Sequence, residues 1–244
     1  LKFFSPNIRL DNAIIIEKLK NMNNAIASHP EPTNEVKKTL GRHMLADGFD
    51  FVMDFEKSQG SWIHDRITGK KFLDMFSMFG SASIGYNHPY LMEKSAWLGR
   101  MAVNKPTLAD VYSQEFADFM TVFERVAIPE HLQYAFFIEG GTMGVENAIK
   151  ACFDWKTRKN FEKGLDLEAG VCIHFKQAFH GRSGYTLSLT NTSDPRKYQY
   201  FPKFDWPRIT NPHLNFPITE ENLAETIKHE NLALLNIEEA ILSN

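Results

Sequence analysis

The sequence predicts an α/β fold built on a mainly parallel sheet with flanking helices. Two continuous apolar runs, residues 134–138 and 171–175, have the composition of strands that are covered on both faces. Between them, apolar residues recur at helical spacing over residues 145–153. A strand, a helix and a second strand in this order form a βαβ unit, in which the strands are parallel and the crossover is right-handed.

A glycine-rich turn joins the first predicted strand to the predicted helix. Gly140, Gly141 and Gly144 surround Thr142 in this turn. On the helix we expect Glu146 and Lys150 to pair at i, i+4 on the face opposite the apolar one. The apolar face itself is made by Val145, Ala148, Ile149, Cys152 and Phe153.

The part of the chain before this unit predicts short strands and one long helix. Apolar and β-branched runs indicate strands at residues 51–55, 61–65 and 71–76, arranged as a meander. Apolar residues at spacings of three and four, after Pro106, predict a helix from about Thr107 to Val126. This stripe is a packing face and requires no ligand.

The charge balance and cysteine content exclude several classes of protein. The formal net charge is −3 with both signs mixed, which disfavours a nucleic-acid surface or a polybasic membrane segment. No apolar stretch reaches the roughly 18 residues of a membrane-spanning helix. The two cysteines, Cys152 and Cys172, form no CxxC pair, so we expect a reducing cytosolic compartment.

The topology predicts where a ligand binds. In a parallel α/β sheet, ligands lie beyond the carboxyl ends of the strands, and here both ends lead into polar loops. Gly141 and Thr142 can hold a phosphate, because glycine permits close approach and the first amides of a helix are free donors. The second loop offers Phe179 to cover a planar heterocycle and Arg182 to hold a carboxylate.

Each of these features also has a purely structural interpretation. The glycine turn is compatible with a simple strand-to-helix connection, Phe179 with a core residue, and Arg182 with a solvated charge. His180 is left undecided between a structural and a functional role. A metal site built from Cys172, His174 and His180 matches no recognised zinc spacing, so we expect buried strand residues and no metal.

Longer segments resemble one family of enzymes. Residues 139–150 are similar to the phosphate loop and following helix of class III aminotransferases, and residues 178–186 to the segment that covers their pyridoxal 5′-phosphate (PLP) ring. The resemblance extends from about residue 40 to the end, and within the family it is most specific to the lysine 6-aminotransferases. The segments that resemble the lysine 6-aminotransferases in particular are residues 187–192, 201–209, 75–89 and 104–112.

The resemblance implies a fold, a cofactor and a division into domains. The fold is that of the type I PLP-dependent transferases, with residues 1–76 as an N-terminal segment belonging to the small domain and 77–244 as the first part of the large domain. Gly141 and Thr142 then donate to the PLP phosphate, Phe179 covers the ring, and Arg182 contacts the substrate carboxylate. Residues 77–83 are expected near the substrate mouth, across a homodimer interface.

The resemblance also implies the reaction, in which the ε-amino group of L-lysine passes to 2-oxoglutarate. The family's Schiff-base lysine, its acidic partner for the pyridine nitrogen and a second substrate arginine match no residue here. Lys176 lies near the site but does not occupy the catalytic position. We therefore expect the chain to be an inactive, aggregation-prone N-terminal half of a longer enzyme.

Three alternatives stay open at this stage. One is another ω-aminotransferase that acts on ornithine or 4-aminobutyrate. The second is a non-catalytic α/β module that binds a phosphate-containing ligand, and the third is a structural segment that binds no ligand.

Overall fold

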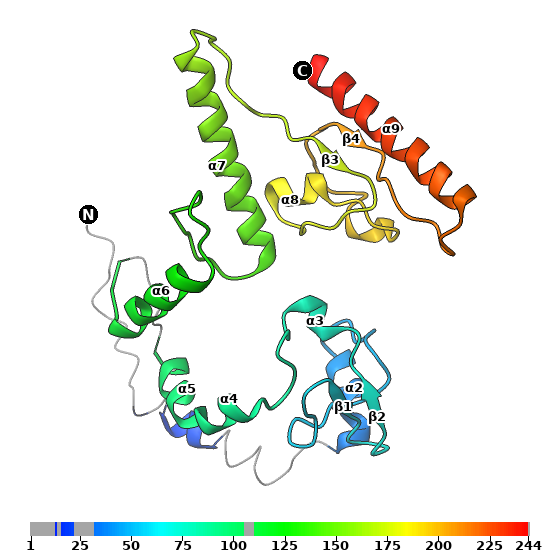
Figure 1. Cartoon of the computed structure of the whole chain (residues 1–244). Helices are drawn as coiled ribbons and strands as arrows, with labels where there is room; N and C mark the ends of the chain where they lie inside the picture. Colours follow the sequence, from blue (N-terminus) through cyan, green and yellow to red (C-terminus); the bar gives the residue numbers. More distant parts are fainter. Residues whose placement is uncertain (1–12, 14–15, 22–31, 105–109, 244) are drawn as a thin grey trace. The chain divides into compact units, whose positions relative to one another are not determined.

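The computed structural model describes residues 13, 16–21, 32–104 and 110–243. It divides into two compact units, Leu1–Val126 and Ala127–Asn244, and each is described by itself (Figure 1). The predicted domain boundary between residues 76 and 77 concerns a different division of the chain and stays a prediction.

The first unit combines a small antiparallel hairpin with short helices. Strands β1 and β2 pair so that Trp62 lies opposite Leu73 and His64 opposite Lys71. The elements are η1 (Thr33–Glu35), α2 (Val36–Gly41), β1 (Trp62–His64), β2 (Lys71–Leu73), α3 (Ser77–Gly80), α4 (Pro89–Glu93), α5 (Ser95–Ala102) and α6 (Gln114–Val126).

The predicted meander is present, but its strands are shorter than expected. Of residues 51–55, Met53 alone forms a bridge, opposite Asp65. The Asp54 carboxylate accepts the amides of Glu56 and Lys57 and so turns the chain directly after the bridge. The third strand ends at Leu73 for the same reason, because the Asp74 carboxylate accepts the two amides of residues 76 and 77.

Helix α6 begins later than the predicted start at Thr107. Residues 105–109 lie outside the described part of the chain, and the helix starts at Gln114. The Ser113 hydroxyl accepts the amide of Phe116, which is the contact of an N-cap residue. The prediction followed the apolar spacing and missed this cap.

The second unit contains the predicted parallel pairing. Strand β3 (His174–Phe175) pairs with β4 (Arg208–Ile209), and His174 lies opposite Arg208. Helix α7 (Gly141–Glu162) precedes β3, and α8 (Gly184–Leu189) and η2 (Pro195–Lys197) lie between the two strands along the chain. Figure 1 shows α8 beside α7, and α9 (Glu220–Leu242) beside β4.

The predicted strand at residues 134–138 is wrong for this structure. Within the described residues, this segment joins no sheet, and Tyr134 is 95% exposed. A strand requires a neighbour for its amide and carbonyl groups, and no described strand lies alongside. The βαβ unit that forms is therefore β3–α8–β4, and the predicted strand 171–175 is reduced to its last two residues.

An aromatic cluster joins α7 to the segment before β4. Ile149 of α7, Leu189 of α8 and Trp206 are buried together, and Phe153 and Tyr185 pack around them. The Trp206 indole donates to the Gly170 carbonyl at 2.8 Å, so its one polar atom is satisfied. This packing confirms Val145, Ile149 and Phe153 of the apolar face predicted for residues 145–153, whereas Ala148 and Cys152 are exposed. A second cluster, Ile209 with Ala233 and Ala240, fixes α9 on β4.

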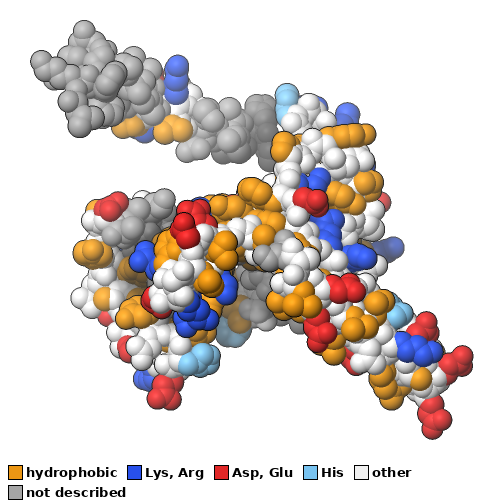
Figure 2. Space-filling model, turned by 90° about the horizontal axis from the view of Figure 1, so that it is seen from above, with side chains coloured by type: hydrophobic (Ala, Val, Ile, Leu, Met, Phe, Trp, Pro, Cys, Tyr) orange, Lys and Arg blue, Asp and Glu red, His pale blue; other side chains and the backbone are white. Residues whose placement is uncertain are grey.

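Large apolar side chains also lie on the surface. Figure 2 shows hydrophobic side chains among charged ones on the visible face. Phe136 is 72% exposed and Tyr200 is 87% exposed. Among the described helices, none has the length and apolar composition needed to cross a bilayer.

Candidate functional site

The start of α7 has the features that a bound anion requires. Gly140 has φ = 82° and precedes the helix, which begins at Gly141. The first amides of a helix have no acceptor within it and point outward, where the helix dipole favours negative charge. Open space surrounds both glycines, because a Cβ at either position would meet no heavy atom within 4 Å.

The side chain of Thr190 holds the loop after β3 in place through hydrogen bonds to its backbone. This threonine is fully buried, and its hydroxyl donates to the Gly181 carbonyl at 2.6 Å while accepting the amide of His180 at 3.1 Å. Beside it, the amide of Asn191 donates to the Ala178 carbonyl at 2.7 Å. The backbone of residues 178–181 is therefore held by hydrogen bonds at three points.

The two loops meet at Thr142 and Gly181. A Cβ on Gly181 would lie 2.5 Å from both Oγ1 and Cγ2 of Thr142, far inside van der Waals contact. Gly181 also has φ = 130°, a conformation that side chains rarely adopt. Glycine at this position lets the second loop approach the start of α7.

The carboxylate of Glu146 makes a second connection between the same elements. Its Oε1 accepts the amide of Tyr185 and its Oε2 the amide of Thr186, both at 3.0 Å. The Ser183 hydroxyl lies 3.5 Å from Oε2. The predicted outward pairing of Glu146 with Lys150 is wrong, because Glu146 is buried and directed at the start of α8.

Phe179, His180 and Arg182 lie in the loop that Gly181 brings to α7. Phe179 is 59% exposed and Arg182 is exposed, so both side chains are available to a ligand. His180 is half-buried, and its described contact is through its backbone amide. The structure brings the two loops proposed from the sequence together through Thr142 and Gly181.

The residues that sequence reasoning missed are Glu146, Gly181 and Thr190. A signal for Glu146 was present, since it lies four residues after Thr142 and thus on the same face of the helix. Gly181 follows Phe179 and His180 in a loop expected to approach a ligand. Nothing in the local pattern distinguishes Thr190 from other threonines.

His174 is a satisfied residue of the sheet, as predicted. It is buried, its Nδ1 lies 3.2 Å from the Cys172 carbonyl, and its Nε2 accepts from Nε of Arg208 at 2.8 Å. Burial is the largest cause that lowers the pKa of His174 below 6.5, and the charge of Arg208 lowers it further. Among the described residues, no three His, Cys, Asp or Glu side chains gather as a metal site would require.

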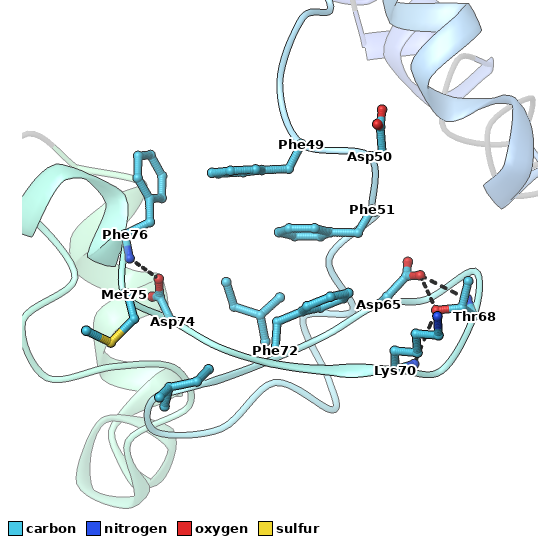
Figure 3. A pocket seen from close by; sticks show the side chains of 12 residues that line it. Phe49, Asp50, Phe51, Asp65, Thr68, Lys70, Phe72, Asp74, Met75 and Phe76 are labelled. Carbon is cyan, nitrogen blue, oxygen red and sulfur yellow. Dashed lines mark hydrogen bonds between the residues drawn. The ribbon is translucent and has the colours of Figure 1, made fainter.

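The first unit contains a separate cavity of about 670 Å³ lined mainly by apolar side chains, among them several phenylalanine rings (Figure 3). Phe51 stacks on Phe49 at 5.5 Å and on Phe72 at 5.3 Å between ring centroids. At its rim, Asp65 accepts the Thr68 hydroxyl, which is the largest cause that lowers the pKa of Asp65 to about 2. These polar groups serve the turns of the hairpin.

A hydrogen bond between Asp74 and Tyr86 closes the chain segment that follows β2. The Tyr86 hydroxyl donates to Asp74 at 2.7 Å, and burial together with this carboxylate raises the pKa of Tyr86 to about 12. The segment then turns through Ser77, Met78 and Phe79, whose φ values of 51°, 48° and 57° are left-handed. Such conformations cost on the order of 1–3 kcal/mol each in side-chain-bearing residues.

The residues present at the two loops fit a phosphate-bearing cofactor. Gly141 offers a backbone amide with open space around it at a helix start, and Thr142 adds an amide and a hydroxyl where Gly181 lets the second loop approach. Phe179 adds an exposed ring beside this point.

Comparisons with known proteins identify the family of the chain. The family profile described as "Aminotransferase class-III" matches residues 45–242. L-lysine-epsilon aminotransferase of Amycolatopsis lactamdurans is 48% identical over 191 residues, which cover 76% of this chain and 42% of that protein. The protein of the same name from Mycobacterium tuberculosis (strain ATCC 25618 / H37Rv) is 47% identical over 204 residues, covering 82% and 45%.

A solved structure shows the same architecture. The lysine aminotransferase from M. tuberculosis superposes with a TM-score of 0.78 at 44% identity, over 87% of this chain and 49% of that one. The chain thus spans about half the length of the curated relatives it matches. The likeness confirms the predicted type I fold of PLP-dependent aminotransferases. The chain belongs to the class III aminotransferases.

Proposed function

We propose that the start of α7 and the loop at residues 178–182 bind PLP. Gly141 and Thr142 donate to its phosphate, and Phe179 covers its ring. The observation that supports the proposal is the contact between Thr142 at the start of α7 and Gly181 in the loop that bears Phe179. When bound, PLP supplies an electron-withdrawing ring that stabilises negative charge at the carbon bearing the transferred amino group.

The chain spans about half the length of its relatives. For the whole protein we propose the activity of an L-lysine 6-aminotransferase. It transfers the ε-amino group of L-lysine to 2-oxoglutarate, giving L-glutamate and 2-aminoadipate 6-semialdehyde. The names and 47–48% identities of the relatives support this substrate. Arg182, exposed next to Gly181, is assigned to a substrate carboxylate because guanidinium binds carboxylates bidentately.

The segment of residues 77–83 is proposed to border the substrate mouth, across the interface of a homodimer. Three consecutive left-handed residues, Ser77, Met78 and Phe79, support this assignment, since backbone strain gathers at functional sites. Phe79 is 92% exposed and thus free to contact a partner or a ligand.

No lysine of this chain is assigned the covalent bond to the cofactor. Lys176 lies nearest in sequence to the second loop, but its amide belongs to the β3–β4 pairing, where it donates to Ile209. We place the enzyme in the cytosol, where a reducing environment keeps Cys152 and Cys172 as free thiols.

Calorimetric titration of the full-length protein in its cofactor-free form tests the cofactor site. We expect PLP to bind, pyridoxal without its phosphate to bind more weakly, and inorganic phosphate to compete with PLP. Thr142→Ala should weaken PLP binding by about tenfold, the loss expected for one hydrogen bond to a charged group. Thr121→Ala, on the exposed face of α6, is the control and should leave binding unchanged. Equal affinity for PLP and pyridoxal would contradict the phosphate assignment.

The substrate is tested on the full-length protein loaded with PLP. Glutamate formation from 2-oxoglutarate is measured with L-lysine, L-ornithine or 4-aminobutyrate as the amino donor. We expect L-lysine to give the highest kcat/KM. A higher value with ornithine or 4-aminobutyrate would replace the lysine assignment while leaving the cofactor site untouched.

A further inference from the structure

Glu146 occupies an unusual place for a carboxylate on a long helix. It is 8% exposed, and each of its oxygens accepts a backbone amide from a segment 39 and 40 positions further along the chain. Those amides, of Tyr185 and Thr186, belong to the start of α8, directly after the loop that carries Phe179 and Arg182. A buried carboxylate is retained only where such donors satisfy it.

We propose that Glu146 is a positioning residue for the cofactor site, whose carboxylate holds residues 178–186 against the start of α7. The inference rests on the proposed function for its ligand. The hydrogen bonds themselves are independent of any ligand.

The spacing along α7 explains why this contact affects the phosphate loop. Thr142 and Glu146 lie one turn apart and thus on the same helix face. Thr142 meets Gly181 directly, and Glu146 accepts the amides of the residues four and five positions after Gly181. Two contacts one helical turn apart fix both the position and the direction of the loop, where a single contact would leave it free to pivot.

Gly184 makes the approach of the carboxylate possible. A Cβ at this position would overlap Oε1 of Glu146, which is the heavy atom nearest to it. Gly184 has no left-handed φ to explain its presence, so the space it leaves for the carboxylate is the physical reason for a glycine here. The Ser183 and Thr186 side chains complete a capping box around the same point.

Glutamine cannot replace Glu146 in this role. A carboxylate has two acceptor oxygens, whereas an amide has one acceptor and two donors. In Glu146→Gln, one of the two backbone amides faces an NH2 group and loses its partner. The variant therefore releases one of the two bonds while it keeps the size of the side chain.

The test compares the cofactor-free full-length protein with three variants by amide hydrogen exchange and by PLP calorimetry. Glu146→Gln is expected to raise exchange at residues 178–186 and to weaken PLP binding about tenfold. Gly184→Ala should do the same, because it displaces the carboxylate without removing it. Glu162→Gln makes the same chemical change at the exposed far end of α7 and should change neither quantity. Exchange within α9 serves as the internal measure of folding and should stay constant.

The possible results distinguish the positioning role of Glu146 from the proposed binding of PLP. Unchanged exchange at residues 178–186 in both site variants would overturn the inference, as would faster exchange with unchanged PLP affinity. If Glu146→Gln also loosens α9, its effect is general, and Gly184→Ala decides in its place. If the unaltered chain does not bind PLP, the proposed function and the cofactor role of Glu146 both fail, while the exchange data still decide whether Glu146 holds the loop.

Discussion

The side chain of Thr142 fills the space that a Cβ on Gly181 would need. Any side chain at residue 181 must therefore displace the loop or the start of α7, and it must also adopt φ = 130°. We predict that Gly181→Ala destabilises the second unit by at least about 1–3 kcal/mol, which is the usual cost of such a backbone conformation. The clash with Thr142 adds to this cost. Urea unfolding monitored by tryptophan fluorescence measures this change.

Gly170→Ala provides the control for this substitution. A Cβ at Gly170 would meet no heavy atom within 4 Å, and its backbone is not left-handed. We expect a change of less than about 0.5 kcal/mol, as for a surface substitution. Equal effects of the two alanines would show that the contact with Thr142 carries no strain.

Trp206 is predicted to be the most costly core residue to truncate in the second unit. It is 7% exposed, stacks on Phe204 at 5.0 Å, and packs with Ile149 and Leu189 between α7 and α8. We expect Trp206→Ala to cost about 3–5 kcal/mol. Differential scanning calorimetry should show the loss, and Trp155→Ala, at an exposed position of α7, should cost far less.

His174 makes the second unit sensitive to mild acid. Its pKa lies below 6.5 in the folded state, so its contribution to stability is present above pH 6.5 and is lost as pH falls through the folded pKa. When His174 is protonated, its Nε2–H and the Nε–H of Arg208 are two donors that face each other, so their hydrogen bond is lost. The nearby His180 also disfavours the charged form of His174. Nitrogen-detected NMR at pH 7.5 should show the Nδ1–H tautomer, and an Nε2–H signal would contradict it.

Asp65 produces a second acid transition, confined to the first unit. Its pKa of about 2 lies below the ordinary 3.8, chiefly because the Thr68 hydroxyl donates to it. The stability it contributes is therefore complete above pH 4 and disappears between about pH 4 and pH 2. Asp65→Asn should flatten this window in a circular-dichroism titration. The same acid transition in the variant and the parent would remove Asp65 as its cause.

The sequence predicted the elements whose pattern is local. The helix after Gly140 was located because its apolar positions and the glycine start are adjacent in the chain. The parallel pairing was predicted in kind, yet β3 found its partner in Arg208–Ile209 and not in residues 134–138. Pairing depends on which neighbour supplies hydrogen bonds, and an apolar run alone does not contain that information.

The sequence offers candidate site residues by type, and their assignment to a cofactor and a substrate stays a prediction. Gly141, Thr142, Phe179 and Arg182 were selected because residues of these types bind phosphates, rings and carboxylates. The inward direction of Glu146 could not be predicted, because an acidic residue on a helix is more often solvated. Its burial follows from two backbone amides that reach it only after the chain has folded back across α7.

The most direct test of the account is hydrogen exchange of the chain with and without PLP. One cofactor that touches both loops should slow exchange at residues 139–143 and at residues 178–182 together, over the same range of PLP concentration. Protection of one loop alone, or of the two at different concentrations, would contradict a single site formed by Thr142 and the loop of Gly181.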